Sequence, residues 1–218
     1  MVTVKIVVEG GVMPHSNVEA QTISNSERLR ESFYKLLTQM VAPTTFNLEI
    51  EMGAGEKNAC KIFKKSIKEK KCSLLIDLDG AKEIRIKRLN DLEIQDYSDF
   101  VFFMIQQMEA WMLSQPKSIE KGLMYSNPNK IEADISDNDI FKQKPYDISQ
   151  PALKLKTLLS RYYYYQKRNI KKKKKYGKLK DAPLFIENLD AVELAKTFED
   201  IAKLFCFLKT NIPNRVGN

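Results

Sequence analysis

The sequence is poor in the residues that build zinc sites, disulfide frameworks and histidine-dependent catalytic sites. Its 218 residues include one histidine, His15, and three cysteines, Cys60, Cys72 and Cys206. Neither a catalytic triad nor a zinc site with histidine ligands can be built from a single histidine in a polar segment. Three scattered cysteines are too few for a disulfide framework. We expect these cysteines to be buried and reduced.

Long apolar runs and nucleotide-binding loops are also missing. No stretch approaches the ~20 apolar residues that span a bilayer, and the first residues lack the basic and long apolar regions of a signal peptide. We therefore predict no membrane partner, and the reduced cysteines predict a cytoplasmic protein. No GxxxxGK[ST] loop is present, so any requirement for ATP must be met by a partner. The 43% hydrophobic content is sufficient for the core of one large domain.

Positive charge is abundant but confined to one part of the chain. Residues 151–218 hold 16 Lys and Arg against 6 Asp and Glu, a balance of +10, whereas the remainder holds 20 against 22. Such asymmetry favours contact with nucleic acid over contact with a membrane. Tyrosines 162–165 precede the basic run, and aromatic rings can stack on single-stranded bases while lysines follow the backbone. A solvated basic tail or a surface for an acidic partner is the alternative. The candidate contacts are Lys57, Tyr162, Lys167, Arg168, Lys171, Lys172, Lys173, Lys174 and Lys175.

Three short aliphatic runs predict strands at residues 3–8, 46–51 and 73–76. Helices are expected between them, one beginning near Ser24 or Ser26 and one over residues 56–70. This alternation predicts a parallel sheet with right-handed crossovers. Residues 99–114 are apolar on nearly every side and predict a buried helix. Residues 116–150 read as irregular, followed by a helix from Pro151 to Tyr165 and a last helix over 191–208.

Carboxylates follow two of these predicted strands. Glu9 comes directly after VKIVV, and Asp77 and Asp79 close SLLIDLD. Ligands gather outside the carboxyl ends of parallel strands, and on an extended backbone Asp77 and Asp79 would share a face. Carboxylates that converge in this way suit Mg²⁺ or Mn²⁺. Acidic residues after strands also serve as helix caps and turn formers, so the pattern alone leaves both interpretations open.

VVEGG followed by a helix and LIDLDG at the end of the third strand resemble the Toprim fold of topoisomerases, bacterial primases and OLD-family nucleases. MIQQMEAWMLSQP at residues 104–116, GAGEKNA at 53–59 and YGKLKDAPLFIENLD at 176–190 are similar to a Toprim-like family encoded beside AAA or ABC-type ATPases in bacterial defence loci. The resemblance implies a Toprim-like core over residues 1–115 and a helical, basic C-terminal region over 116–218. It also implies that Glu9, Asp77, Asp79 and Glu109 are catalytic and that the first three bind metal. Asp79 departs from the pattern, which leaves the number of metal ions open.

These expectations converge on a metal-dependent nuclease that uses Mg²⁺ or Mn²⁺ and forms the effector subunit of an ATPase-coupled antiviral system. Two other functions fit the sequence: a non-catalytic nucleic-acid-binding or assembly module, and a primase-like phosphoryl transferase. Glu109 could instead pair with a lysine or arginine in the core, since buried charges need partners. Homo-oligomerisation is left open.

Overall fold

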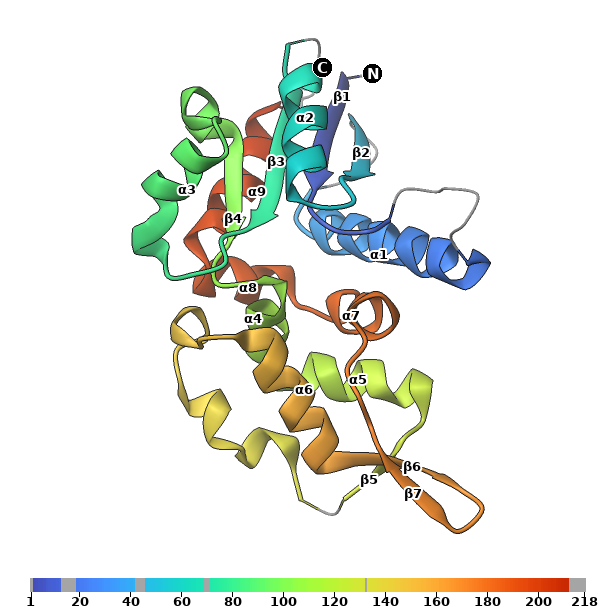
Figure 1. The fold of residues 1–218 in the computed structure, drawn as a ribbon. Helices are drawn as coiled ribbons and strands as arrows, with labels where there is room; N and C mark the ends of the chain where they lie inside the picture. The colour runs from blue at the N-terminus through green and yellow to red at the C-terminus, as the bar shows by residue number, and fades with distance from the viewer. Residues whose placement is uncertain (1, 13–18, 42–45, 69–70, 132, 212–218) are drawn as a thin grey trace, which may run out of the picture.

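The computed structural model describes residues 2–12, 19–41, 46–68, 71–131 and 133–211, so His15 lies outside the described residues. Four parallel strands form the main sheet in the order β2-β1-β3-β4 (Figure 1). The predicted α/β class, with a parallel sheet flanked by helices, is confirmed. The strands are β1 (Val2–Val8), β2 (Phe46–Met52), β3 (Lys71–Asp77) and β4 (Val101–Met104).

Helices cover both faces of this sheet. In Figure 1, α2 (Glu56–Ser66) lies in front of β3 and α9 (Glu199–Asn211) lies behind β4. α1 (Ala20–Thr38) packs against β2 and begins earlier than predicted. Ser26 is therefore not a cap: it is buried inside the helix, where its hydroxyl accepts a hydrogen bond from the Val12 amide at 3.1 Å.

Residues 99–114 do not form one helix, which corrects the prediction. Val101–Met104 is the strand β4, a turn follows, and the helix α4 covers only Met108–Leu113. All four residues of β4 are buried beside β3. A short apolar run gives the same periodicity in a buried strand as in a buried helix. Its aromatic and β-branched side chains favour the strand once a neighbouring strand is available.

The outer edge of β4 is closed by an ion pair. Asp200 of α9 accepts a hydrogen bond from the Phe103 amide at 3.0 Å and pairs with Arg85. Arg85, at the start of α3 (Arg85–Asp91), also donates to the Val101 carbonyl at 2.9 Å. These two side chains satisfy backbone groups that would otherwise be open to another strand.

The described parts of residues 108–197 lie beyond the carboxyl edge of the sheet and include more helix than predicted (Figure 1). The sequence predicted no regular structure over residues 116–150. The helix α5 nevertheless begins at Pro116, a residue type that suits the first position of a helix. The predicted last helix over 191–208 is two helices. The elements not yet given are η1 (Lys82–Ile84), η2 (Gln95–Phe100), α5 (Pro116–Ser126), β5 (Asn129–Lys130), η3 (Ile135–Asp137), η4 (Asp139–Lys142), η5 (Pro145–Asp147), α6 (Pro151–Tyr162), β6 (Tyr163–Lys167), β7 (Ile170–Lys173), α7 (Lys178–Ile186) and α8 (Ala191–Thr197).

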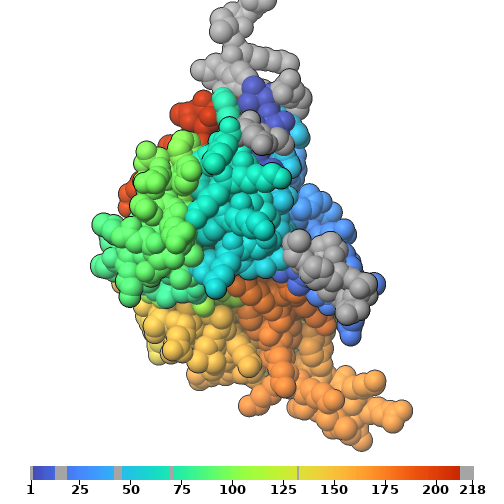
Figure 2. Space-filling model, turned by 45° about the horizontal axis from the view of Figure 1, so that its top comes forward, coloured from blue at the N-terminus to red at the C-terminus, as the bar shows by residue number. Residues whose placement is uncertain are grey.

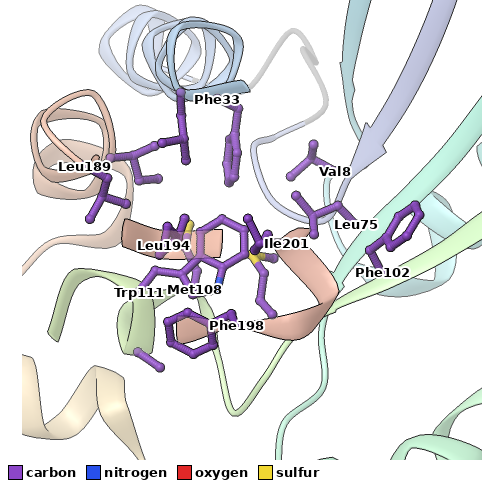
Figure 3. Close-up of a cluster of buried hydrophobic side chains, with 14 of the residues drawn as sticks. Val8, Phe33, Leu75, Phe102, Met108, Trp111, Leu189, Leu194, Phe198 and Ile201 are labelled. Carbon is purple, nitrogen blue, oxygen red and sulfur yellow. The ribbon is translucent and has the colours of Figure 1, made fainter. Parts of the chain in front are cut away.

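A buried aromatic cluster joins the sheet layer to these lower helices (Figure 3). Trp111 of α4 is fully buried, with its ring centroid 6.4 Å from that of Phe33 in α1 and 6.4 Å from that of Phe198. Aromatic pairs at this separation add to the stabilisation from apolar burial. The cluster fixes the position of α4, and with it the direction of Glu109.

Two smaller expectations have different outcomes. Cys60 and Cys72 are buried as predicted, but Cys206 on α9 is exposed. Burial raises the pKa of the Cys60 thiol to about 11, and the negative charge of Glu56 raises it further. This thiol therefore stays protonated at neutral pH. None of the helices in the described ranges is both long enough and apolar enough to cross a membrane.

Candidate functional site

The strand order places a topological switch point between β1 and β3. The chain leaves β1 toward β2 on one side and leaves β3 toward β4 on the other, so the topology switches between these two strands. Ligands of open α/β sheets bind at such a point, outside the carboxyl ends of the strands. Glu9 follows β1 and Asp77 ends β3. The structure brings them into contact, because the Asp77 amide donates to Glu9 Oε2 at 3.1 Å.

Asp77 is almost fully buried and both of its carboxylate oxygens have partners. Oδ1 accepts a hydrogen bond from the Met108 amide at 2.8 Å, and Oδ2 lies 3.2 Å from Lys178 Nζ. Burial raises the pKa of Asp77 to about 6; the Lys178 charge opposes this shift and the Glu109 charge adds to it. The carboxylate is therefore held in an environment that disfavours its charged form.

Glu9 carries the larger perturbation. Its pKa is raised to about 7, first by burial and then by the Asp77 charge, while the hydrogen bond from the Asp77 amide acts in the opposite direction. Two adjacent carboxylates that both resist ionisation form a site that a cation would stabilise. Near neutral pH, Glu9 also exchanges readily between its charged and neutral forms.

Asp79 lies at the margin of this cluster. β3 ends at Asp77, Leu78 is buried, and Asp79 turns into the left-handed region with φ of 55°. Its half-exposed carboxylate binds Arg88 at 3.1 Å and Gln107 Nε2 at 3.1 Å. The backbone is thus not extended through residue 79, which corrects the expectation that both aspartates share a strand face. The Asp79 charge still contributes, weakly, to the raised pKa of Glu9.

Glu109 is fully buried on α4, and among the described residues no lysine or arginine forms an ion pair with it. Its Oε1 accepts a hydrogen bond from the Tyr176 hydroxyl at 2.9 Å. Its Oε2 is buried and has no hydrogen-bond partner within the part of the chain that the structure describes. A buried oxygen without a partner is costly in a folded protein. Its position near Asp77 makes it a further acidic donor toward the same site.

Lys178 and Tyr176 are the site residues that sequence reasoning missed. Burial alone would lower the pKa of Lys178, but the charges of Asp77 and Glu109 outweigh it and raise that pKa. The pKa of Tyr176 is raised well above its usual value by burial and by the Glu109 charge. Both residues lie at the start of the 176–190 segment, whose sequence signal is its resemblance to a family.

The carboxylate oxygens of this site are suitable ligands for a hard divalent cation. Their present positions do not bring enough of them together to bind one. Across the described ranges, no three His, Cys, Asp or Glu side chains are placed to hold one metal ion. The cause is local: Asp77 is engaged by Met108 and Lys178, and Asp79 is drawn to Arg88. Carboxylate oxygens, one of them without a partner on Glu109, are nevertheless the ligands that Mg²⁺ and Mn²⁺ prefer.

The predicted nucleic-acid contacts lie mainly on a hairpin and not on a helix. Tyr163–Lys167 and Ile170–Lys173 are the antiparallel strands β6 and β7, because consecutive tyrosines favour a strand. Two candidates are corrected. Tyr162 is buried at the end of α6, and Lys174 is buried in an ion pair with Asp181 at 2.6 Å. The exposed candidates are Lys57 on α2 and Lys167, Arg168, Lys171, Lys172, Lys173 and Lys175 on or beside the hairpin.

The fold and these residues define an α/β protein with an acidic site at the switch point of a parallel sheet. The chain belongs to the family described as a domain of unknown function (DUF4276), whose family model matches residues 8–209. This match includes the acidic site and the basic hairpin. No curated protein and no solved structure matches the chain.

Proposed function

We propose that this protein is a metal-dependent nuclease that hydrolyses phosphodiester bonds in nucleic acid. The observation that carries the proposal is the contact between Glu9 and Asp77 at the switch point, where burial raises their pKa values to about 7 and about 6. Strongly perturbed carboxylates in the crevice of a sheet are typical of catalytic or metal sites. Packing alone gives no reason to hold two acids together in this way.

Mg²⁺ or Mn²⁺ would be held by Glu9 and Asp77, with Asp79 or Glu109 nearby, and when bound would activate water and neutralise charge on the phosphate. Glu9 can accept a proton at near-neutral pH because its pKa is about 7. Lys178 supplies a positive charge beside Asp77 that can contact a phosphate oxygen. Tyr176 holds Glu109 in position through its hydroxyl.

The wider role in the proposal rests on the resemblance to Toprim-like proteins encoded beside ATPases. In this role the protein is the effector of an antiviral system, and an AAA or ABC-type ATPase controls it. The sequence contains no GxxxxGK[ST] loop, which is consistent with a partner that supplies ATP hydrolysis.

A second candidate function is a nucleic-acid-binding module that does not cleave. The position of Lys178 Nζ, 3.2 Å from Asp77, favours it, because an ammonium group can neutralise this carboxylate without any metal. On this alternative the basic hairpin carries the function and the acidic cluster is structural.

Cleavage and metal binding, measured separately, distinguish the two functions. Labelled DNA and RNA are incubated with Mg²⁺ or Mn²⁺, with EDTA as the blank, and Mn²⁺ binding is measured by isothermal titration calorimetry. Glu9→Gln and Asp77→Asn should abolish cleavage and weaken Mn²⁺ binding. Glu31→Gln, at an exposed position of α1, removes the same charge elsewhere and should change neither. A wild-type protein that binds nucleic acid but neither binds Mn²⁺ nor cleaves, even with an ATPase partner, would contradict the nuclease proposal.

A further inference from the structure

The hairpin projects away from the rest of the molecule as a narrow ribbon. In Figures 1 and 2, β6 and β7 form an arm at the end of the molecule farthest from the top of the sheet. β5 pairs with β6 only at Tyr163 and Tyr164, so the outer half of the ribbon has two strands. Its turn is formed by Arg168, which has φ of 55°, and Asn169. Both turn residues are exposed.

The charge of this arm has one sign. Residues 163–173, the two strands and their turn, contain five Lys and Arg and no Asp or Glu. The strand register places Lys171 and Lys173 on one face of the ribbon, the same face as their cross-strand partners Gln166 and Tyr164. Lys172 and Lys167 lie on the other face. All four of these lysines are exposed. The ribbon is therefore cationic on both faces. This arrangement suits a ligand that surrounds the ribbon with negative charge on two sides.

None of the three ribbon tyrosines, at 163–165, is an exposed platform for bases. Tyr163 is buried. Lys171 Nζ lies 5.0 Å from the centre of the Tyr164 ring, and Lys174 Nζ lies 5.9 Å from that of Tyr165. Recognition of single strands depends on aromatic faces that bases can cover. Here lysine ammonium groups already occupy a face of each ring.

We propose that this ribbon enters the major groove of B-form duplex DNA, an inference that rests on the proposed function and names its nucleic acid. That groove is about 12 Å wide and admits a two-stranded ribbon between two phosphate backbones. Lysines on the two ribbon faces then meet the two backbones. Arg168 and Asn169 at the tip carry the donor and acceptor groups that read base edges. The major groove of duplex RNA is too narrow for such an element.

The test measures binding by the full chain in EDTA, so that no cleavage is required. Fluorescence anisotropy compares a DNA duplex of about 20 base pairs with the single strand and with duplex RNA of the same length. Duplex DNA should bind about tenfold more tightly than either. Lys171→Ala/Lys173→Ala and Lys167→Ala/Lys172→Ala should each weaken binding and each lower the salt slope by about two, about one for each lost phosphate contact.

The matched control is Lys61→Ala/Lys65→Ala on α2, which removes two exposed charges from a distant helix and should leave duplex binding almost unchanged. Trp111 fluorescence checks that each variant is folded. Tighter binding of single strands or duplex RNA would overturn the inference, as would a loss confined to one ribbon face or equal losses in the control. Each of these results would leave the nuclease proposal standing if cleavage still required Glu9 and metal.

Discussion

Replacing Glu9 by glutamine should stabilise the metal-free protein at pH 8. The folded-state pKa of Glu9 is raised from its usual 4.5 to about 7, so the folded state binds the proton more tightly than the unfolded state does. Linkage then requires the free energy of unfolding to fall as pH rises from about 4.5 to about 7. The destabilisation is fully present above pH 7 and absent below pH 4.5. Glutamine removes the charge while its carbonyl can still accept the Asp77 amide.

The size of the effect follows from the shift. The rise in the pKa of Glu9 from 4.5 to about 7, at about 1.36 kcal/mol for each pKa unit, gives an upper value of roughly 3.4 kcal/mol. Glu9 is only partly buried, and water screens its charge, so we expect about 1–2 kcal/mol at pH 8. At pH 4.5 most of the difference should disappear, because Glu9 is then protonated in the folded state.

The assay is urea denaturation in EDTA at pH 8 and pH 4.5, followed by the fluorescence of Trp111. This residue is the only tryptophan and is fully buried between Phe33 and Phe198, so unfolding exposes it. Glu31→Gln reports the general effect of losing one negative charge. A Glu9 variant that is less stable than the wild type at pH 8, or that gains the same stability at both pH values, would contradict this prediction.

Three further predictions use the same denaturation assay. Lys174→Met should destabilise the fold by about 3–5 kcal/mol, because it leaves Asp181 buried without its partner; adding Asp181→Leu should recover much of the loss, and no recovery would argue against an electrostatic cause. Asp200→Ala should cost about 2–4 kcal/mol through the loss of its bond to Phe103 and of its ion pair, and a smaller loss in Asp200→Asn would identify the ionic part. Gly122→Ala should cost about 1–3 kcal/mol, since a Cβ atom there would lie 2.7 Å from a backbone oxygen of α7; an unchanged midpoint would show that α5 and α7 can separate.

The parts of the fold that the sequence predicted are those in which local pattern and tertiary setting agree. β1 is mostly aliphatic, and residues 4–8, which include Lys5, are all buried between two parallel neighbours. Val101–Met104 escaped prediction because four apolar residues carry too little periodicity to separate strand from helix. The hairpin escaped because its turn is Arg168-Asn169 and lacks the glycine that marks most tight hairpins.

The sequence predicted the residues of the site that lie at the ends of strands. Glu9 and Asp77 follow apolar runs, and parallel strands place such residues at one edge whatever their order in the sheet. Lys178 could not be found in this way. It lies 101 residues from Asp77 along the chain and reaches it only because α7 packs beneath α1. Asp79 was wrongly expected to share a strand face with Asp77. Its backbone turns into the left-handed region after β3 ends, and its carboxylate contacts Arg88 and Gln107.

The closure of the β4 edge has a consequence for synthesis on the ribosome. β4 ends at Met104 and its cover, α9, begins at Glu199, so 94 residues separate the strand from the helix that protects it. At about 5–20 residues per second, the backbone groups of β4 wait on the order of 5–20 seconds for Asp200 to be made. During that interval an open apolar strand edge can pair with another chain. Nascent chains should therefore need chaperone protection until α9 emerges, more than the modest size of the domain would suggest.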